Sequence, residues 1–299
     1  MDRLDSMVIV LEVAQAGSLS AAARNLRMPL ATVSRKVSEL ESHLGAQIFT
    51  RTSRRLTLTD SGEAYVAACR RIVDDITEAE RTMAGEFRTP KGELVVTAPV
   101  VFGQMHVLPV AAAFLKAHPD VDLRLVLTDQ ALNLGEEHVD VALRIGPLPD
   151  SQMRARLIGT IRRVTCASPA YLAARGRPRT PADLIDHDGI TIDSLASAAG
   201  WPFRDGKRDL MAPIRSRVRV NTPPAAIDAA IAGLGLTRVL SYQVAEACRR
   251  GDLQIVLEPF EPEPWPVHLV HMAQGPVALK VRAFLDWAAP ELKARLLGV

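Results

Sequence analysis

Cysteine is scarce in this chain of 299 residues, and its three cysteines, Cys69, Cys166 and Cys248, stand far apart in the sequence. No C-x-x-C spacing occurs, so the sequence favours neither a zinc site nor a disulfide framework. Such cysteine usage is typical of the reducing cytoplasm, where we expect the protein to act. We therefore predict no metal ion and no other cofactor.

Long apolar runs are also missing, and we expect no leader segment. The first residues, Met1-Asp2-Arg3-Leu4-Asp5, do not form a basic region followed by an apolar one, so we predict no secretory signal. No stretch approaches the roughly 18 uninterrupted apolar residues of a membrane-spanning helix, so we expect no membrane partner. The net charge is only +2, and a positive surface for DNA must therefore be local.

The first part of the chain shows the spacing of three short helices. Apolar residues recur at helical intervals over 4–16, and a Gly-Ser pair at 17–18 ends that helix and starts the next, over 19–26. Positions 27–29 form a turn, because the proline at its end disfavours a helical residue before it. A third helix is predicted over 30–44, with one apolar face and one polar, partly basic face.

A basic hairpin is predicted after these helices, with short strands over 47–50 and 56–58 and a loop between them that has the form of a wing. A basic run alone is usually a solvated surface. Here the cations lie beside a helix-turn-helix pattern, which fits phosphate neutralisation and entry into a DNA groove. Residues 24–55 carry only two carboxylates, Glu39 and Glu41, against seven cations: Arg24, Arg27, Arg35, Lys36, Arg51, Arg54 and Arg55.

A long helix is predicted over 60–87. Its apolar residues follow the alternating spacing of three and four that forms an a/d seam, suited to pairing with a second helix. The alternative is a single helix packed on its own domain. We favour pairing, because a long helix between two domains otherwise has little to pack on. The seam residues are Tyr65, Cys69, Ile72, Ile76, Ala79 and Met83.

After a hinge at 89–92, strands alternate with helices. This alternation is typical of mostly parallel sheets covered by helices, an α/β architecture. The Gly233-Leu234-Gly235 segment is too short for a dinucleotide fingerprint, and we interpret it as the cap of the helix before it. Strands are predicted over 93–98, 121–128, 139–145, 162–167, 217–220 and 267–271, and helices over 103–117, 169–174, 222–232 and 276–288.

Motifs throughout the chain match one known family. In the N-terminal part they are Ala21-Ala22-Ala23-Arg24-Asn25-Leu26, Thr32-Val33-Ser34-Arg35-Lys36-Val37, Leu40-Glu41, Leu44-Gly45, Phe49-Thr50-Arg51-Thr52 and Leu56-Thr57-Leu58-Thr59-Asp60-Ser61-Gly62. In the C-terminal part they include Ala98-Pro99-Val100, His118-Pro119-Asp120-Val121, Asp140-Val141-Ala142-Leu143-Arg144-Ile145-Gly146 and Ala167-Ser168-Pro169-Ala170-Tyr171-Leu172. The chain resembles the LysR-type transcriptional regulators over essentially its whole length.

This resemblance implies a fold class: an N-terminal all-α winged helix-turn-helix and a long linker helix, then a C-terminal α/β two-lobed module like a periplasmic binding protein. We expect a DNA-binding domain over 1–59, a dimerising linker helix over 60–88 and an effector-binding regulatory domain over 89–299. In that domain, lobe 1 takes about 91–162 and 267–299, and lobe 2 takes about 163–266.

The resemblance also implies that the third helix enters the major groove. Thr32, Ser34 and Arg35 match the family's base and backbone contacts, since the arginine fork suits guanine or phosphate and the hydroxyls are short donors. Lys36 is a further candidate, and Arg51 and Arg54 lie along the flanking backbone or minor groove. Where the family often has Ser or Gln, this chain has Pro29 and Leu30. Leu30 either touches a thymine methyl group or packs on the first helix, and we favour packing.

The family's effector site lies between the two lobes, where small ligands usually bind. The resemblance places the turn after the first strand in this site, with the helix start near Thr222, and backbone N–H groups at such starts favour a carboxylate. The turn lacks the Ser or Thr of many relatives, which points to a relatively apolar ligand. Further candidates are Asp129, Arg144, Trp201 and Phe203, for which core packing or a surface ion pair is the alternative. The residues of the turn are Pro99, Val100, Val101, Phe102 and Gly103.

The expected partners are double-stranded DNA, a small-molecule effector, RNA polymerase and further copies of the chain, as a dimer and, by resemblance, a tetramer. An enzyme is the main alternative. However, neither G-x-S-x-G nor H-E-x-x-H occurs, and the three-residue step between His268 and His271 on a strand is poor metal geometry. We therefore predict no enzyme. A third alternative is an architectural DNA binder whose C-terminal module no longer binds a ligand.

Overall fold

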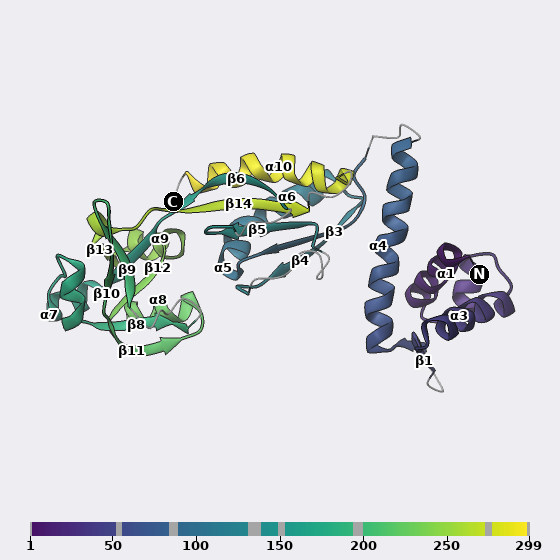
Figure 1. Cartoon of the computed structure of the whole chain (residues 1–299), viewed down its shortest axis with the longest axis horizontal. Coiled ribbons are helices and arrows are strands. Elements are labelled where there is room, and N and C mark those ends of the chain that lie inside the picture. The colour runs from purple at the N-terminus through teal and green to yellow at the C-terminus, as the bar shows by residue number, and fades with distance from the viewer. Residues whose placement is uncertain are drawn as a thin grey trace. The chain divides into compact units, whose positions relative to one another are not determined.

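The computed structural model describes residues 2–51, 56–83, 89–130, 139–148, 153–193, 200–272 and 277–297. The chain divides into two compact units, Met1–Thr89 and Pro90–Val299, each with its own core. Figure 1 shows the helices of the first unit and the sheets of the second.

The first unit is a helix-turn-helix followed by a hairpin and a long helix. Side-chain caps set the helix starts: Asp2 accepts from the backbone N–H groups of Leu4 and Asp5, and Ser18 accepts from that of Ala21. The expected three helices and wing strands are confirmed. The elements are α1 (Arg3–Ala16), α2 (Leu19–Asn25), α3 (Leu30–Leu44), β1 (Phe49–Arg51), β2 (Leu56–Leu58) and α4 (Asp60–Met83).

The first turns of α4 belong to the core of this unit. The Thr59 hydroxyl donates to the Gln47 carbonyl at 2.7 Å and accepts from the Gly62 N–H at 2.9 Å, which ties the start of α4 to the segment just before β1. Tyr65 packs against the core and Cys69 is fully buried. This end of the predicted seam therefore packs on its own domain, as the alternative interpretation held.

Farther along α4, Ile72 is exposed over 42% of its surface, and the pairing of two such helices stays a prediction. The side chains of Ala79 and Met83, which complete the seam, lie outside the described part of the structure.

Lobe 1 of the second unit is a five-stranded sheet in the order β4-β3-β5-β14-β6. The helices pack their apolar faces on it, and Figure 1 shows α10 running along β6 and β14. The elements are β3 (Gly92–Ala98), α5 (Val100–Phe102), η1 (Gly103–Val107), α6 (Leu108–Ala117), β4 (Val121–Leu127), β5 (Val141–Ile145), β6 (Met153–Ile161), β14 (Trp265–Met272) and α10 (Leu279–Leu296).

Lobe 2 is a second five-stranded sheet, in the order β11-β8-β12-β7-β13, with a separate β9-β10 hairpin. Its elements are β7 (Arg163–Ala167), α7 (Pro169–Arg175), η2 (Pro181–Asp186), β8 (Asp188–Ile192), β9 (Trp201–Asp205), β10 (Arg208–Ala212), β11 (Arg215–Val220), α8 (Pro223–Ile231), β12 (Leu236–Leu240), α9 (Ser241–Arg250), β13 (Gln254–Val256) and η4 (Glu258–Phe260).

The two sheets share one departure from a parallel arrangement. Among the described strands, β14 runs against the other four of lobe 1 and β7 runs against the other four of lobe 2. Each of these strands enters its lobe directly from a crossover, without a helix that returns the chain to the same end of the sheet. The expected mostly parallel, two-lobed α/β module is confirmed.

Among the residues that the structure describes, one segment, Val100–Ala117, is long and apolar enough by composition to cross a membrane, and α1 and α2 pass the same test only if joined across a 117° bend. In the structure Val100–Ala117 lies on lobe 1, with Phe102, Val110 and Phe114 buried in its core. Packing in a protein core accounts for this composition.

Candidate DNA interface and effector cavity

The polar face of α3 lies opposite the core residues Val33 and Val37. Thr32 and Ser34 are half-buried, whereas the Arg35 side chain is 62% exposed. Arg35 Nη1 forms a 2.5 Å ion pair with Glu39 Oε1, one turn along the helix. Exposed pairs of this kind contribute little to stability, so the guanidinium remains available to a phosphate or a base edge.

Two neighbouring residues of α3 differ from the expectation. Lys36 Nζ lies 3.3 Å from Asp5 Oδ2, and its side chain is only 19% exposed, so it also ties α3 to the first turn of α1. Leu30 is 47% exposed and lies outside the buried core cluster, so our preference for packing was wrong. The first residue of the helix instead presents an apolar side chain to solvent.

A residue that we did not assign anchors the wing. The Glu41 carboxylate accepts hydrogen bonds from the backbone N–H groups of Ile48 at 2.8 Å and Phe49 at 3.1 Å. It thereby fixes α3 to β1, the strand that ends at Arg51. Arg54 lies outside the described residues. The signal for Glu41 was a carboxylate on a helix that ends just before the hairpin.

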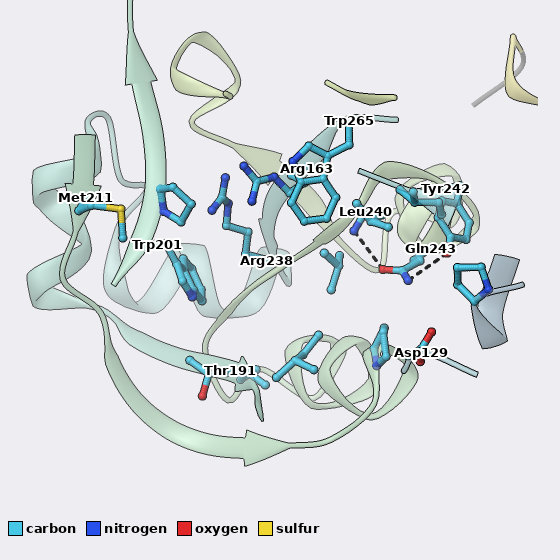
Figure 2. A pocket seen from close by; sticks show the side chains of 17 residues that line it. Asp129, Arg163, Thr191, Trp201, Met211, Arg238, Leu240, Tyr242, Gln243 and Trp265 are labelled. Atoms are coloured by element: carbon cyan, nitrogen blue, oxygen red, sulfur yellow. Dashed lines mark hydrogen bonds between the residues drawn. The ribbon is translucent and has the colours of Figure 1, made fainter. Parts of the chain in front are cut away.

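A cavity of about 600 Å³ opens in the second unit, within the size range of small-molecule sites. Residues of both lobes line it, and Figure 2 shows their side chains. Of the ten predicted effector-site residues, Pro99, Asp129 and Trp201 line this cavity. The remaining lining residues are Ile145, Arg163, Ile190, Thr191, Ile192, Pro202, Met211, Pro223, Arg238, Val239, Leu240, Tyr242, Gln243 and Trp265.

The predicted turn after β3 is helical from its second residue, because α5 begins at Val100. Phe102 is fully buried, and its ring meets the ring of Tyr242, itself a lining residue, at 5.3 Å. Gly103 lies against Leu127, where a Cβ atom would stand 2.2 Å from Cδ2. Val100, Val101, Phe102 and Gly103 thus lie beside or behind the cavity lining rather than in it.

The other three predicted residues also lie outside the lining. Arg144 is half-buried on β5, opposite His268 of β14, and burial lowers its pKa. Phe203 is 2% exposed and carries the Arg238 guanidinium over its ring at 4.9 Å. Thr222 is exposed and precedes α8, whose first residue, Pro223, does line the cavity.

Two arginines dominate the polar lining, and sequence reasoning missed both. Arg163 begins β7 and its guanidinium lies 4.2 Å above the Trp265 ring, while Arg238 lies on β12. Burial lowers the pKa of both groups, and the positive charge of Arg163 lowers that of Arg238 further. Arginine nevertheless stays protonated. For Arg238 the available signal was an arginine inside an otherwise uncharged strand, Leu236–Leu240.

Aromatic rings pack around the lining residue Tyr242 of the cavity. Tyr242 is 2% exposed, burial raises its pKa, and its hydroxyl accepts from Gln243 Nε2 at 3.3 Å. Gln243 Oε1 in turn accepts from the Leu240 N–H, as Figure 2 shows. His106 packs against the Tyr242 ring at 5.5 Å, and burial lowers its pKa, which keeps it neutral near pH 7. These packed rings fix the shape of the cavity at this side.

These features define a class of protein: a DNA-binding regulator with a separate small-molecule-binding module. Family comparison specifies it further. The model of the bacterial regulatory helix-turn-helix protein, lysR family, matches residues 4–63, and the LysR substrate binding domain model matches residues 87–293. The chain belongs to the LysR family of transcriptional regulators.

Individual relatives support this assignment over the whole length. The chain is 33% identical over 289 residues to the HTH-type transcriptional repressor PA14_22550 of Pseudomonas aeruginosa, covering 96% of this chain and 91% of the relative. It is similar to the structure of CrgA, a LysR-type regulator from Neisseria meningitidis, with a TM-score of 0.61, 30% identity and coverage of 96% and 98%. Full-length AphB of Vibrio cholerae gives a TM-score of 0.61, 26% identity and coverage of 95% and 98%. The named relatives are regulators of transcription, which favours the regulator over the enzyme that we considered as the main alternative.

Proposed function

We propose that this LysR-type regulator is controlled by a small molecule bound in the cavity between its lobes. The observation that carries the proposal is that residues of both lobes line one cavity, with Asp129 and Ile145 from lobe 1 and Trp201 and Arg238 from lobe 2. A ligand that contacts both lobes changes their relative stability and orientation, and so biases the conformations of the assembly that reads DNA.

The proposed DNA contact is α3 in the major groove with the wing on the flanking backbone. Thr32, Ser34 and Arg35 supply donors on the exposed side of α3. Lys36 neutralises phosphate while held near Asp5. Arg51 and Arg54, predicted from the sequence, are the further candidates for contact with the flanking backbone or minor groove. The exposed Leu30 at the start of α3 fits an apolar contact such as a thymine methyl group.

We further propose that pairs of α4 helices form a dimer, which presents two α3 helices to an inverted-repeat site in the cytoplasm. The exposed Ile72 supports this contact, because a large apolar side chain on a long helix gains by burial against a partner. Contacts between regulatory domains extend the dimer to a tetramer, and the bound assembly meets RNA polymerase at the promoter.

The test is fluorescence anisotropy with DNA from upstream of the adjacent, divergently read gene, against scrambled DNA, at several salt concentrations. We expect tight, sequence-dependent binding with a steep salt slope, and a change in affinity when the effector is added. A ligand at 100 times its dissociation constant also adds about 2.7 kcal/mol of stability, which thermal unfolding detects. Equal affinity for both DNAs under all conditions contradicts the proposal.

A further inference from the structure

We propose that the effector is a carboxylate with a flat apolar body, and that Arg163 and Arg238 of lobe 2 hold its carboxylate. This inference rests on the proposed function, since it concerns the ligand of the same cavity. It moves the anion site away from the helix starts, where the sequence led us to expect it, to the guanidinium groups of strands β7 and β12.

The two helix starts at the cavity have few donors to offer. At the start of α5, the Val100 N–H already donates to Asp129 Oδ1 at 3.1 Å. The carboxylate of Asp129 thus occupies the position that a ligand carboxylate would take, and it repels a second anion there. At the start of α8, Pro223 and Pro224 have no N–H groups at all.

The two arginines have donors to spare. The Nε atom of Arg163 and the Nε and Nη2 atoms of Arg238 are buried and have no hydrogen-bond partner in the described part of the chain. Buried donors of native proteins are nearly always paired. The acceptor for these atoms therefore has to come from a bound molecule rather than from the chain itself. Figure 2 shows both guanidinium groups side by side in the cavity, between Trp265 and Trp201.

Aromatic rings hold both groups without using these donors. Arg163 lies over Trp265 at 4.2 Å and Arg238 over Phe203 at 4.9 Å. A ring under the face of a guanidinium fixes its plane and leaves the N–H groups at its edge free for a carboxylate. The two side chains are therefore preorganised for a planar oxyanion.

Nearby carboxylates offset the charge of this pair only in part: burial lowers the pKa of Arg238 more than Glu261 raises it, and the Glu261 carboxylate forms its ion pair with Arg162. Glu258 and Glu261 both bind Arg162, with Glu261 Oε2 at 2.7 Å from its Nε atom. Among the described residues, neither Arg163 nor Arg238 has an ion pair with a carboxylate, and Figure 2 places Asp129 on the other side of the cavity. The two half-buried guanidinium groups repel each other, which lowers the pKa of Arg238 beyond the effect of burial, and a bound anion offsets that repulsion.

The rest of the lining near the arginines is apolar and flat. Trp201 and Met211 lie on the Arg238 side of the cavity in Figure 2, and Pro202, Ile190 and Val239 also line it. A ring-sized body fits this surface, because aromatic faces stack on rings and exclude water around the charged end. The chemistry therefore identifies a ring-bearing carboxylate rather than a neutral or strongly polar ligand.

The experiment compares thermal unfolding of the full chain with benzoate, its neutral isostere benzamide and inorganic phosphate, at equal concentration and ionic strength. We expect benzoate to raise Tm, and the other two to raise it much less. In Arg163→Met and Arg238→Met we expect benzoate affinity to fall at least about tenfold. Arg238→Lys keeps the charge but loses the fork of the guanidinium, so its benzoate affinity should lie between those of the wild type and Arg238→Met. Arg219→Met, on the exposed surface of β11, is the matched control and keeps the wild-type response.

Equal shifts with benzoate and benzamide, or a benzoate shift that survives in both methionine variants, overturn the inference while a ligand-binding cavity stands. A phosphate shift equal to that of benzoate overturns the carboxylate assignment. No benzoate shift in the wild type overturns the inference as well. The operator-binding test is independent of all four results, and only its failure removes the proposed function.

Discussion

The arginines of the DNA-binding unit and those of the cavity differ in solvent exposure and in their partners. Arg35 is exposed and lies next to Glu39, whereas Arg163 and Arg238 are partly buried, rest on aromatic rings and have unpaired donors. Exposed cations bind polyanions through many weak, screened contacts, so that binding depends on salt. Partly buried cations without a partner lower the stability of the ligand-free protein, and an anion of matching shape restores it. They therefore favour one kind of ligand over others.

The largest expected effect is a difference in the free energy of unfolding between variants of two carboxylates on α3, Glu41 and Glu39. Glu41→Ala removes two hydrogen bonds to backbone N–H groups at β1, and we expect it to lower the free energy of unfolding by about 2–4 kcal/mol. Glu39→Ala loses only an exposed ion pair, and should change it by less than about 0.5 kcal/mol. Urea unfolding of both variants measures the difference. Similar values for the two would contradict the anchoring role of Glu41.

Arg35→Ala is expected to weaken operator binding by about 1–3 kcal/mol and to blur sequence preference, because a guanidinium that reads a base edge is lost. Its stability should remain close to the wild type, since the side chain is exposed. Anisotropy titrations with operator and scrambled DNA measure both effects, with Arg219→Ala as control. If affinity and preference are both unchanged, α3 is not docked as we propose.

Ile72→Glu tests the exposed part of α4. Placing a charge on a helix-pairing surface should lower self-association, by roughly tenfold or more in dimer affinity, while the isolated fold is unaffected. Sedimentation velocity over a range of protein concentrations reports this change. The matched substitution Val8→Glu, at another exposed apolar residue, should leave the assembly as it is. An unchanged dimer in Ile72→Glu would place the interface elsewhere.

The smallest expected effect is a pH dependence from His106. Burial first, and the positive charge of Arg295 second, lower its pKa in the folded state below the 6.5 of the unfolded chain. The unfolded state therefore binds more protons below pH 6.5, and stability falls as the pH drops from 6.5 towards the folded pKa, by at most about 1.4 kcal/mol per pH unit. His106→Leu should flatten this slope in thermal unfolding between neutral and mildly acidic pH. A slope identical to the wild type would remove His106 as its cause.

The sequence predicted those elements whose signal is local. Capping residues and apolar spacing located α1, α2 and α3, and the alternation of strands and helices predicted β3, β4, β5 and α8 within a few residues. We did not predict β6, β8, β12 or the β9-β10 hairpin. Strand β6 reads Met-Arg-Ala-Arg-Leu along its exposed first half, and its place in the sheet comes from pairing with the distant β14.

The cavity was harder to predict for a similar reason. Pro99, Asp129 and Trp201, which we predicted for the effector site, line the cavity. The pair of Arg163 and Arg238 arises only when β7 and β12 lie side by side, 75 residues apart in the chain. Family resemblance directed attention to the helix starts. It could not show that Asp129 occupies the Val100 N–H and that two prolines remove N–H groups at the start of α8, which leaves those starts few free donors.

The measurement that tests the central claim most directly is the ligand-free stability of Arg238→Met. If the guanidinium is held unpaired for a ligand, removing it should raise the free energy of unfolding by about 1 kcal/mol or more, while Arg219→Met changes it little. A loss of stability in Arg238→Met would show that the arginine supports the fold of lobe 2, and would contradict the account of the cavity given above.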